Sequence, residues 1–578
     1  VLAMGDSADV ESRVSAVQGL ARRLGYANRP EEMRELLQAQ LPDLLPRCSS
    51  RARLELQAAL IQALGSGHRW QEALGLAEKL GAVAESLEAN GIAMWIWRWA
   101  GTSNSALGRP DRAQAAFERG IRSWEAWRRD ASHADWQERR TRMAIPLAQA
   151  YADFLASRPG VADSVRVAAA FDLIQRFKSR TLRERLSRSE ATRRAGADLP
   201  ITSGSLRADV LRPGELLLEW FAGENITLLF AVSRGEQRLI RFPNAEIRDP
   251  IKVARGLLER PPQHDADFRA AAAVTRELGH VLLARVSDMV AGARTVIVAP
   301  DDLLHGIPFA ALEIPGSHVH GALAEERSVV VVPSATVFAE VRSRRQPGSG
   351  RGLLAVSPGG RSTGRPTEAA KEVEWLAADY EEVTRVATEA GRPLTPTDLA
   401  GFGALHFAGH STVDERFPWR SAIATSVVVK EGARAPDDSL GAALRAEAIV
   451  SSRLDARLAV LASCQTIGAQ AVRGEGVAGL ASGFLAAGVP TVIATLWPVD
   501  DLATERLMRE FYTHLSRGET AAHALRAAQA KLRRHRVTRH PWYWAGFVLV
   551  GKGETTLLLR PRPLSREGLL RRVVPGRR

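Results

Sequence analysis

Apolar residues recur at helical spacing through residues 1–190, whereas short apolar runs bounded by turn residues follow from about residue 205. The first pattern predicts one helix after another, because apolar positions three and four residues apart share a helix face. The second predicts strands that alternate with helices, and therefore a mostly parallel sheet with right-handed crossovers. We predict an N-terminal all-α region followed by an α/β fold.

Polar and glycine-rich stretches divide this pattern further. We predict a helical region over 1–190, a first α/β unit over 200–345, a second over 350–552 and a basic tail over 553–578. The expected strands are 215–221, 226–232, 239–242, 295–299, 328–332, 353–356, 491–496, 545–550 and two runs that end near His410 and Cys464. The expected helices of the two units are 266–290, 367–380, 476–487, 502–515 and 520–534.

The helical region contains a weak repeat. Residues 69–77 resemble residues 110–117, and 166–171 provide a possible third copy. The turn at 107–111 is similar to the joint between tetratricopeptide (TPR) helices, although the copies lie further apart than the usual 34 residues. Such arrays form curved surfaces that bind peptides or partner proteins. The alternative is an irregular helical bundle without a groove.

Two of the apolar runs end at residues with reactive side chains. Gly403-Ala-Leu-His-Phe-Ala-Gly-His410 ends at a histidine, and Leu458-Ala-Val-Leu-Ala-Ser-Cys464 ends at a cysteine. If these strands are parallel neighbours, both side chains leave the sheet at one edge, where α/β folds place their sites. His410 and Cys464 can then form a thiol–imidazole pair. The alternative is that Cys464 is a small buried apolar residue, as free cysteines commonly are.

An ordered series of motifs accompanies this pair. The chain resembles the caspase and separase clan of cysteine peptidases, and specifically the CHAT domain of bacteria, over roughly residues 165–552. The motifs are Leu211-Arg-Pro-Gly-Glu, Val296-Ile-Val-Ala-Pro-Asp, His305-Gly-Ile-Pro-Phe309, Val332-Pro-Ser334, Gly474-Glu-Gly-Val-Ala-Gly479, Thr495-Leu-Trp497-Pro-Val-Asp-Asp501 and Trp542-Tyr-Trp-Ala-Gly-Phe547. The resemblance implies a caspase-like fold and a cysteine endopeptidase with specific protein substrates.

The resemblance also assigns roles at the site. Cys464 is the expected nucleophile, His410 the proton shuttle, and backbone N–H groups near Ser411 and Cys464 hold the oxyanion. The family usually has glycine where this chain has Ser411, and serine resists a positive φ angle. An inactive CHAT scaffold that only binds partners is therefore the alternative function.

Two aspartates follow Trp497. In the related separases an aspartate near this place recognises the basic residue before the cleaved bond. By resemblance, Asp501, and less surely Asp500, is expected to bind a substrate Arg or Lys. Helix capping is the competing interpretation, because an aspartate before Leu502-Ala-Thr-Glu505 suits an N-cap.

Other ligand sites have weaker support. His406 and His410 fall on one strand face, but no third metal ligand is near them in sequence, so we expect no metal. The glycines of 474–479 match a dinucleotide fingerprint, yet the preceding strand ends about ten residues too early for its tight turn. We therefore expect no cofactor, and we interpret His305 as a structural residue.

Composition restricts the environment and the partners. The 578 residues carry a net charge of +13, almost entirely from arginine, but no concentrated motif supports nucleic acid as a direct ligand. Two cysteines fit a reducing cytoplasm. The uncharged run near Gly476 is broken by Gly488-Val-Pro490, so we expect no membrane span. The tail from residue 554 carries seven Arg and two Glu, and we expect it to be a solvated extension.

Overall fold

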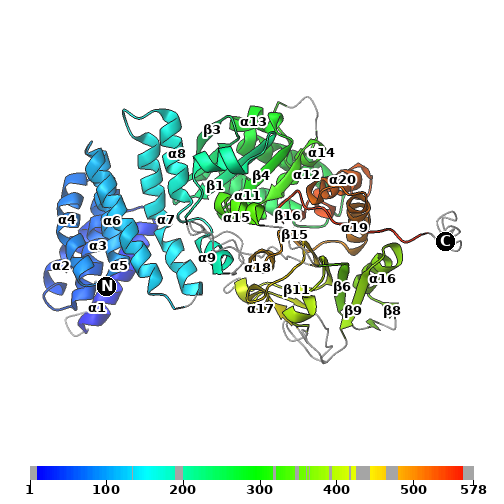
Figure 1. Ribbon diagram of the computed structural model, residues 1–578. Coiled ribbons are helices and arrows are strands. Elements are labelled where there is room, and N and C mark those ends of the chain that lie inside the picture. The colour runs from blue at the N-terminus through cyan, green and yellow to red at the C-terminus, as the bar shows by residue number, and fades with distance from the viewer. Residues whose placement is uncertain are drawn as a thin grey trace. The chain divides into compact units, whose positions relative to one another are not determined.

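A computed structural model describes residues 9–132, 134–188, 199–316, 321–344, 350–358, 361–362, 365–388, 394–414, 418–424, 443–463 and 479–563 (Figure 1). The chain divides into two compact units, Val1–Phe177 and Lys178–Arg578. The predicted fold class is confirmed: the first unit is helical, and the second is built on a mostly parallel sheet flanked by helices.

The first unit is a regular succession of helices. They are α1 (Val10–Tyr26), α2 (Pro30–Leu44), α3 (Ser50–Ser66), α4 (Trp70–Ser86), α5 (Asn90–Ala106), α6 (Pro110–Arg129), α7 (Ala134–Ser157) and α8 (Asp163–Ile174). The first six helices begin every 20 residues, and Asn28, His68, Glu88 and Gly108 take a positive φ in the turns. Each helix pair therefore spans about 40 residues. This period explains why the two similar segments, at the starts of α4 and α6, lie further apart than in a 34-residue repeat.

Large aromatic side chains fill the space between these helices. Trp97 and Trp99 are buried on α5. A Cβ atom at Gly65 of α3 would lie 2.2 Å from the Trp99 ring, and one at Gly81 of α4 would lie 2.5 Å from the Trp97 ring. These glycines therefore provide the room in which the indoles pack, so the tryptophans hold neighbouring helices together.

An eleven-stranded sheet forms the centre of the second unit, in the order β3-β2-β1-β4-β5-β16-β15-β14-β10-β6-β9. Its strands are β1 (Glu215–Ala222), β2 (Ile226–Val232), β3 (Gln237–Pro243), β4 (Thr295–Ala299), β5 (Ser328–Val331), β6 (Leu353–Pro358), β9 (Val383–Thr388), β10 (Ala404–Gly409), β14 (Leu458–Ser463), β15 (Thr491–Thr495) and β16 (Phe547–Gly551). The antiparallel pairs are β1–β2, β2–β3 and β15–β16. The two predicted α/β segments thus share one sheet, joined where β5 runs parallel to β16.

Helices cover this sheet, and the short strands form two small sheets of their own, β11-β12-β13 and β7-β8. The helices are α9 (Arg180–Arg188), α10 (Ser203–Ser205), α11 (Asn244–Leu258), α12 (Asp265–Leu283), α13 (Ser287–Gly292), α14 (Leu323–Glu326), α15 (Ala335–Ser343), α16 (Glu368–Asp379), α17 (Ala446–Val450), α18 (Leu480–Ala486), α19 (Asp501–Ser516) and α20 (Ala521–Arg534). The short strands are β7 (Arg361–Ser362), β8 (Arg365–Pro366), β11 (Ser411–Thr412), β12 (Ala422–Ala424) and β13 (Ala443–Arg445). Within the described ranges, every helix is too short or too polar to cross a bilayer.

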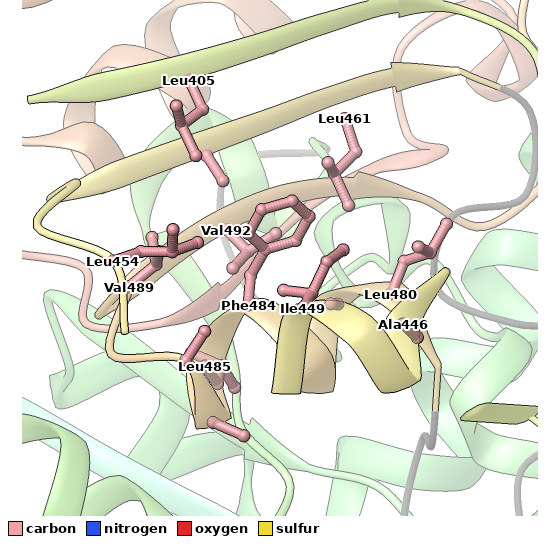
Figure 2. Packing of buried hydrophobic residues seen from close by; sticks show 14 of the residues in the cluster. Leu405, Ala446, Ile449, Leu454, Leu461, Leu480, Phe484, Leu485, Val489 and Val492 are labelled. Carbon is pink, nitrogen blue, oxygen red and sulfur yellow. The ribbon is translucent and has the colours of Figure 1, made fainter. Parts of the chain in front are cut away.

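The core beside strands β10, β14 and β15 is apolar on one face (Figure 2). Phe484 of α18 lies among Leu405, Leu461 and Val492 of these strands. Its ring centroid is 5.6 Å from that of Phe407. Helices α17 and α18 therefore cover this face of the strands with apolar side chains.

The opposite end of the sheet buries an ion pair. Lys178 and Glu219 are both fully buried, with Nζ and Oε1 3.4 Å apart. The Lys178 ammonium also donates to the carbonyl oxygens of Trp220 and Ala299, at 2.7 and 2.8 Å. A buried ammonium is tolerated only when several acceptors surround it. Here strands β1 and β4 supply these acceptors, so Lys178 is bound to both strands.

The beginning of the tail is packed rather than solvated, which corrects our expectation. Glu554 pairs with Arg212 and Arg342, and Thr555 is buried. Further on, Arg562 donates from its backbone N–H to the carbonyl oxygen of Asp379 at 2.8 Å. The Arg562 side chain also donates to the carbonyl oxygen of Tyr380, and the carbonyl oxygen of Arg560 accepts the N–H of Glu381. Residues 564–578 lie outside the described residues.

Two buried histidines predict the behaviour of the second unit in acid. Burial and the nearby Lys178 ammonium lower the pKa of His305 to about 3. Burial lowers the pKa of His540 to about 4, against the opposing effect of Asp267. Between about pH 4 and 6.5 the unfolded chain therefore holds two protons that the folded chain lacks. We expect these histidines to lower the free energy of unfolding by about 2.7 kcal/mol per pH unit as the pH falls through this window.

Urea denaturation of the protein at several pH values measures this slope. A His305→Leu variant removes one of the two protons, so its slope is expected to be shallower by about 1.4 kcal/mol per pH unit. An exposed histidine, His280, provides the control through His280→Leu, which should leave the slope unchanged. Equal slopes in wild type and His305→Leu would contradict the assignment.

Candidate active site

Strands β10 and β14 are parallel neighbours in the sheet. Their register pairs Ala404 with Leu458 and continues to Gly409 with Ser463. His410 follows β10 directly, and Cys464 follows Ser463 directly in the sequence. The premise on which we predicted the pair, adjacent parallel strands, is confirmed. Cys464 itself lies outside the described residues, as do residues 474–478 of the glycine-rich motif.

The backbone around His410 is held by a small antiparallel sheet. The carbonyl oxygen of His410 accepts the N–H of Ala424 at 2.9 Å, and Ser411 pairs with Ile423. The positive φ angle in this segment is at Gly409, at 126°. A Cβ there would lie 2.6 Å from Cδ of Pro358, so position 409 requires glycine. Ser411 is extended and bears no such strain.

Asp500 and Asp501 differ in their structural roles at the start of α19. Asp500 is the N-cap of α19, and its carboxylate accepts the N–H of Ala503 at 2.8 Å. Asp501 is the first residue of the helix and is exposed. The capping interpretation is therefore confirmed for Asp500. It does not account for the carboxylate of Asp501.

Asp501 belongs to an acidic group at the same edge as His410. Loss of hydration raises the pKa of Asp501, and the carboxylates of Asp500, Glu368 and Glu372 raise it further. The His410 imidazole acts in the opposite direction. The two glutamates come from the first turns of α16, where Glu368 also pairs with Lys371 and the buried Glu372 lies against His406. This group carries excess negative charge.

A buried polar contact lies beneath the site. His406 is fully buried, and its Nδ1 lies 3.0 Å from the hydroxyl oxygen of Tyr512 in α19. Its Nε2 lies 3.2 Å from Oε1 of Glu372 in α16. Our expectation that His406 packs behind the site is confirmed. His406 thus connects the sheet to both helices that carry the acidic group.

Sequence reasoning missed part of this arrangement. Neither Glu368 nor Glu372 was among the site residues predicted from the sequence. The signal that could have found them is their spacing, because residues four apart share a helix face.

A further contact fixes the strand ends, since the Thr495 hydroxyl donates to the carbonyl oxygen of Ser463 at 2.6 Å.

A cavity of about 390 Å³ lies elsewhere in the unit. It is lined by residues of α12 and of the segment after α20, among them Phe268, Arg269, His540 and Trp544. None of the candidate site residues lines it. The acidic group beside His410 is therefore not part of this cavity.

Comparison with known proteins shows what this part of the chain resembles. Residues 272–552, just under half of the chain, match the family model described as CHAT domain. The chain is similar to CHAT domains over this matched segment. The strands that carry His410 and Ser463 and the helix that carries Asp501 all lie within it. The earlier motif at residues 211–220 lies outside the matched residues.

Individual proteins give more limited similarity. A stretch of 108 residues is 36% identical to human (Homo sapiens) tetratricopeptide repeat protein 28, covering 19% of this chain and 4% of that protein. The separase–securin complex of Saccharomyces cerevisiae has a TM-score of 0.43 at 9% identity, covering 95% of this chain and 54% of that chain. The TPR-like repeats of a Podosopora anserina kinesin light chain have a TM-score of 0.23 at 18% identity, over 34% of this chain and 83% of that chain.

The Tyr512–His406 contact predicts a measurable loss of stability. Tyr512→Phe removes the hydroxyl while keeping the buried ring, and so leaves a buried imidazole nitrogen without that partner. We expect the free energy of unfolding to fall by about 1–3 kcal/mol. Urea denaturation measures the change. Tyr26→Phe, at an exposed tyrosine of the helical unit, is the matched control and should be neutral. A neutral Tyr512→Phe would show that the contact contributes nothing.

Proposed function

We propose that the CHAT domain is a cysteine endopeptidase that uses His410 and Cys464 as its catalytic pair. The observation that carries the proposal is the parallel register of β10 and β14, which ends at Gly409 and Ser463. Neighbouring strands lie about 4.8 Å apart, so chain segments that continue from them leave the sheet one strand spacing apart. Imidazole and thiol are the groups that acyl transfer requires at such a place.

The reaction follows from the chemistry of these two groups. The Cys464 thiolate attacks the peptide carbonyl carbon, and backbone N–H groups near Ser411 and Cys464 stabilise the oxyanion. The carbon–nitrogen bond breaks, and the His410 imidazolium gives its proton to the leaving amine. Water then attacks the thioester, His410 accepts its proton, and the acid product leaves as the thiolate is restored.

The acidic group indicates the substrate class. Asp501, Asp500 and Glu368 place negative charge beside His410, and the pKa of Asp501 is raised first by loss of hydration and then by repulsion from the other carboxylates. A substrate guanidinium or ammonium relieves this repulsion and forms charge-assisted hydrogen bonds. We therefore assign cleavage after Arg or Lys, with Asp501 as the principal contact and Asp500 as a weaker one.

The helical unit has a separate role in this proposal. Its paired helices repeat every 40 residues, and stacked helix pairs of this kind present extended surfaces to peptides and proteins. We assign this unit to the binding of a substrate protein or of an activating partner.

Replacement of the catalytic pair provides the first test. Cys464→Ala and His410→Ala are each expected to lower kcat/KM on a fluorogenic peptide library by at least about 10³-fold, because the two groups act as a unit. Cys48→Ala is the matched control, since Cys48 is the other cysteine of the chain. Activity that survives Cys464→Ala would overturn the peptidase assignment. Silence of the wild type, repeated after a lysate is added as a source of activator, would favour the inactive scaffold.

Replacement of the aspartates tests the substrate class. Asp501→Asn is expected to lower kcat/KM for Arg peptides by about 10–100-fold, the loss of a hydrogen bond to a charged group, with little effect on neutral peptides. Asp500→Asn keeps the helix cap and should have the smaller effect. The preference for Arg should disappear as the pH falls through the raised pKa of Asp501, because the protonated carboxyl no longer attracts a cation. Equal activity of Asp501→Asn on Arg peptides would exclude this role.

A further inference from the structure

Three potential metal ligands meet at the turn between α19 and α20. His514, Glu519 and His523 each offer one ligand atom, and these atoms all lie within 4.8 Å of one another. Oε2 of Glu519 is 2.8 Å from Nδ1 of His514 and 3.1 Å from Nε2 of His523. One carboxylate oxygen thus lies between two imidazole nitrogens that belong to different helices.

The turn itself brings these residues together. His514 lies in the last turn of α19, and Gly518 takes a φ of 82°, which reverses the chain. Thr520 caps α20 and accepts the N–H of His523. Glu519 and His523 are four residues apart, so they face the same side as α20 begins. The backbone therefore presets the positions of all three side chains.

The distances suit a small transition-metal ion. Zinc binds imidazole nitrogen at about 2.0–2.1 Å and carboxylate oxygen at about 2.0–2.2 Å, so tetrahedral geometry places ligand atoms about 3.3 Å apart. The two measured separations are near this value. The side chains are 20%, 30% and 46% exposed for His514, Glu519 and His523, so an ion and a completing water can reach them from solvent.

The alternative to metal coordination is that Glu519 simply accepts hydrogen bonds from the two histidines. The distances of 2.8 and 3.1 Å fit N–H···O bonds as well as shared coordination. The two cases differ in what they need: a hydrogen bond needs a proton on each imidazole nitrogen, whereas a metal ion needs that nitrogen unprotonated. Metal titration therefore separates them.

We infer that His514, Glu519 and His523 form a binding site for a divalent transition-metal ion of the zinc class, contrary to the absence of metal that the sequence indicated. The ion ties the end of α19 to the start of α20. His514 follows Asp501 by 13 residues in α19 (514 − 501), so the site lies about 20 Å along the helix from Asp501. It is separate from the candidate active site and does not depend on the proposed function.

Titration of the full-length, metal-free protein with Zn²⁺ is the experiment. Calorimetry is expected to show one Zn²⁺ ion bound per chain. The Tm of thermal unfolding should rise by about 3 °C when the free Zn²⁺ concentration is a hundred times the Kd. His514→Asn, His523→Asn and Glu519→Gln should each weaken binding at least about 10-fold, since even outer-shell changes cost that much. His280→Asn, at an exposed histidine of α12, is the matched control and should bind normally.

Two results would overturn the assignment. Absence of Zn²⁺ binding to the wild type would leave only a hydrogen-bonded cluster. Binding that persists in His514→Asn and His523→Asn would place the ion elsewhere in the chain, and Cys464→Ala would show whether the thiol holds it. Co²⁺ provides a readout independent of stability, because nitrogen and oxygen ligation changes its visible absorption. That change should be lost in the same three variants and kept in His280→Asn.

Discussion

The parallel pairing of β10 with β14 is the constraint on which the second unit depends. Side chains alternate between the two faces of a strand, so a shift of one residue would exchange the faces of every side chain. The observed register places Leu405 and Phe407 against the apolar helices α17 and α18, and His406 against α16 and α19. The same register carries His410 out of the sheet beside the strand that ends at Ser463. Core packing and site geometry are therefore determined by one set of backbone hydrogen bonds.

The two faces of these strands contribute differently. The apolar face supplies burial, which is large and nondirectional. The other face carries the hydrogen bond of His406 to Tyr512, which is directional and constrains how α19 lies on the sheet, and the 3.2 Å approach of His406 to Glu372 of α16. Because Glu368 and Asp501 begin these two helices, a buried histidine that plays no part in the chemistry helps to set the positions of the carboxylates at the surface.

Strands and helices with clear hydrophobic periodicity could be predicted from the sequence. Strands β2 and β4 have the predicted bounds, α19 is longer than predicted by one residue at each end, and α20 begins one residue later than predicted. Three features could not be predicted. Helix α11 contains Pro250 and follows β3 without a turn signal, and β9 is a short polar strand at the sheet edge. The continuity of the sheet through β5 and β16 joins residues more than 200 positions apart, which no local pattern records. The acidic group likewise combines α16 with α19, so only the two aspartates that are adjacent in sequence were found.

The electrostatics of α19 favour a binding role for Asp501 over a structural one. A carboxylate at a helix N-terminus is normally stabilised by the helix dipole, which lowers its pKa. The pKa of Asp501 is raised instead, first by loss of hydration and then by three neighbouring carboxylates. Asp500 already satisfies the N-cap, so Asp501 adds repulsion without adding a cap. Under the proposed function, a basic side chain of the substrate relieves this repulsion, which is the physical reason for assigning Asp501 to substrate binding.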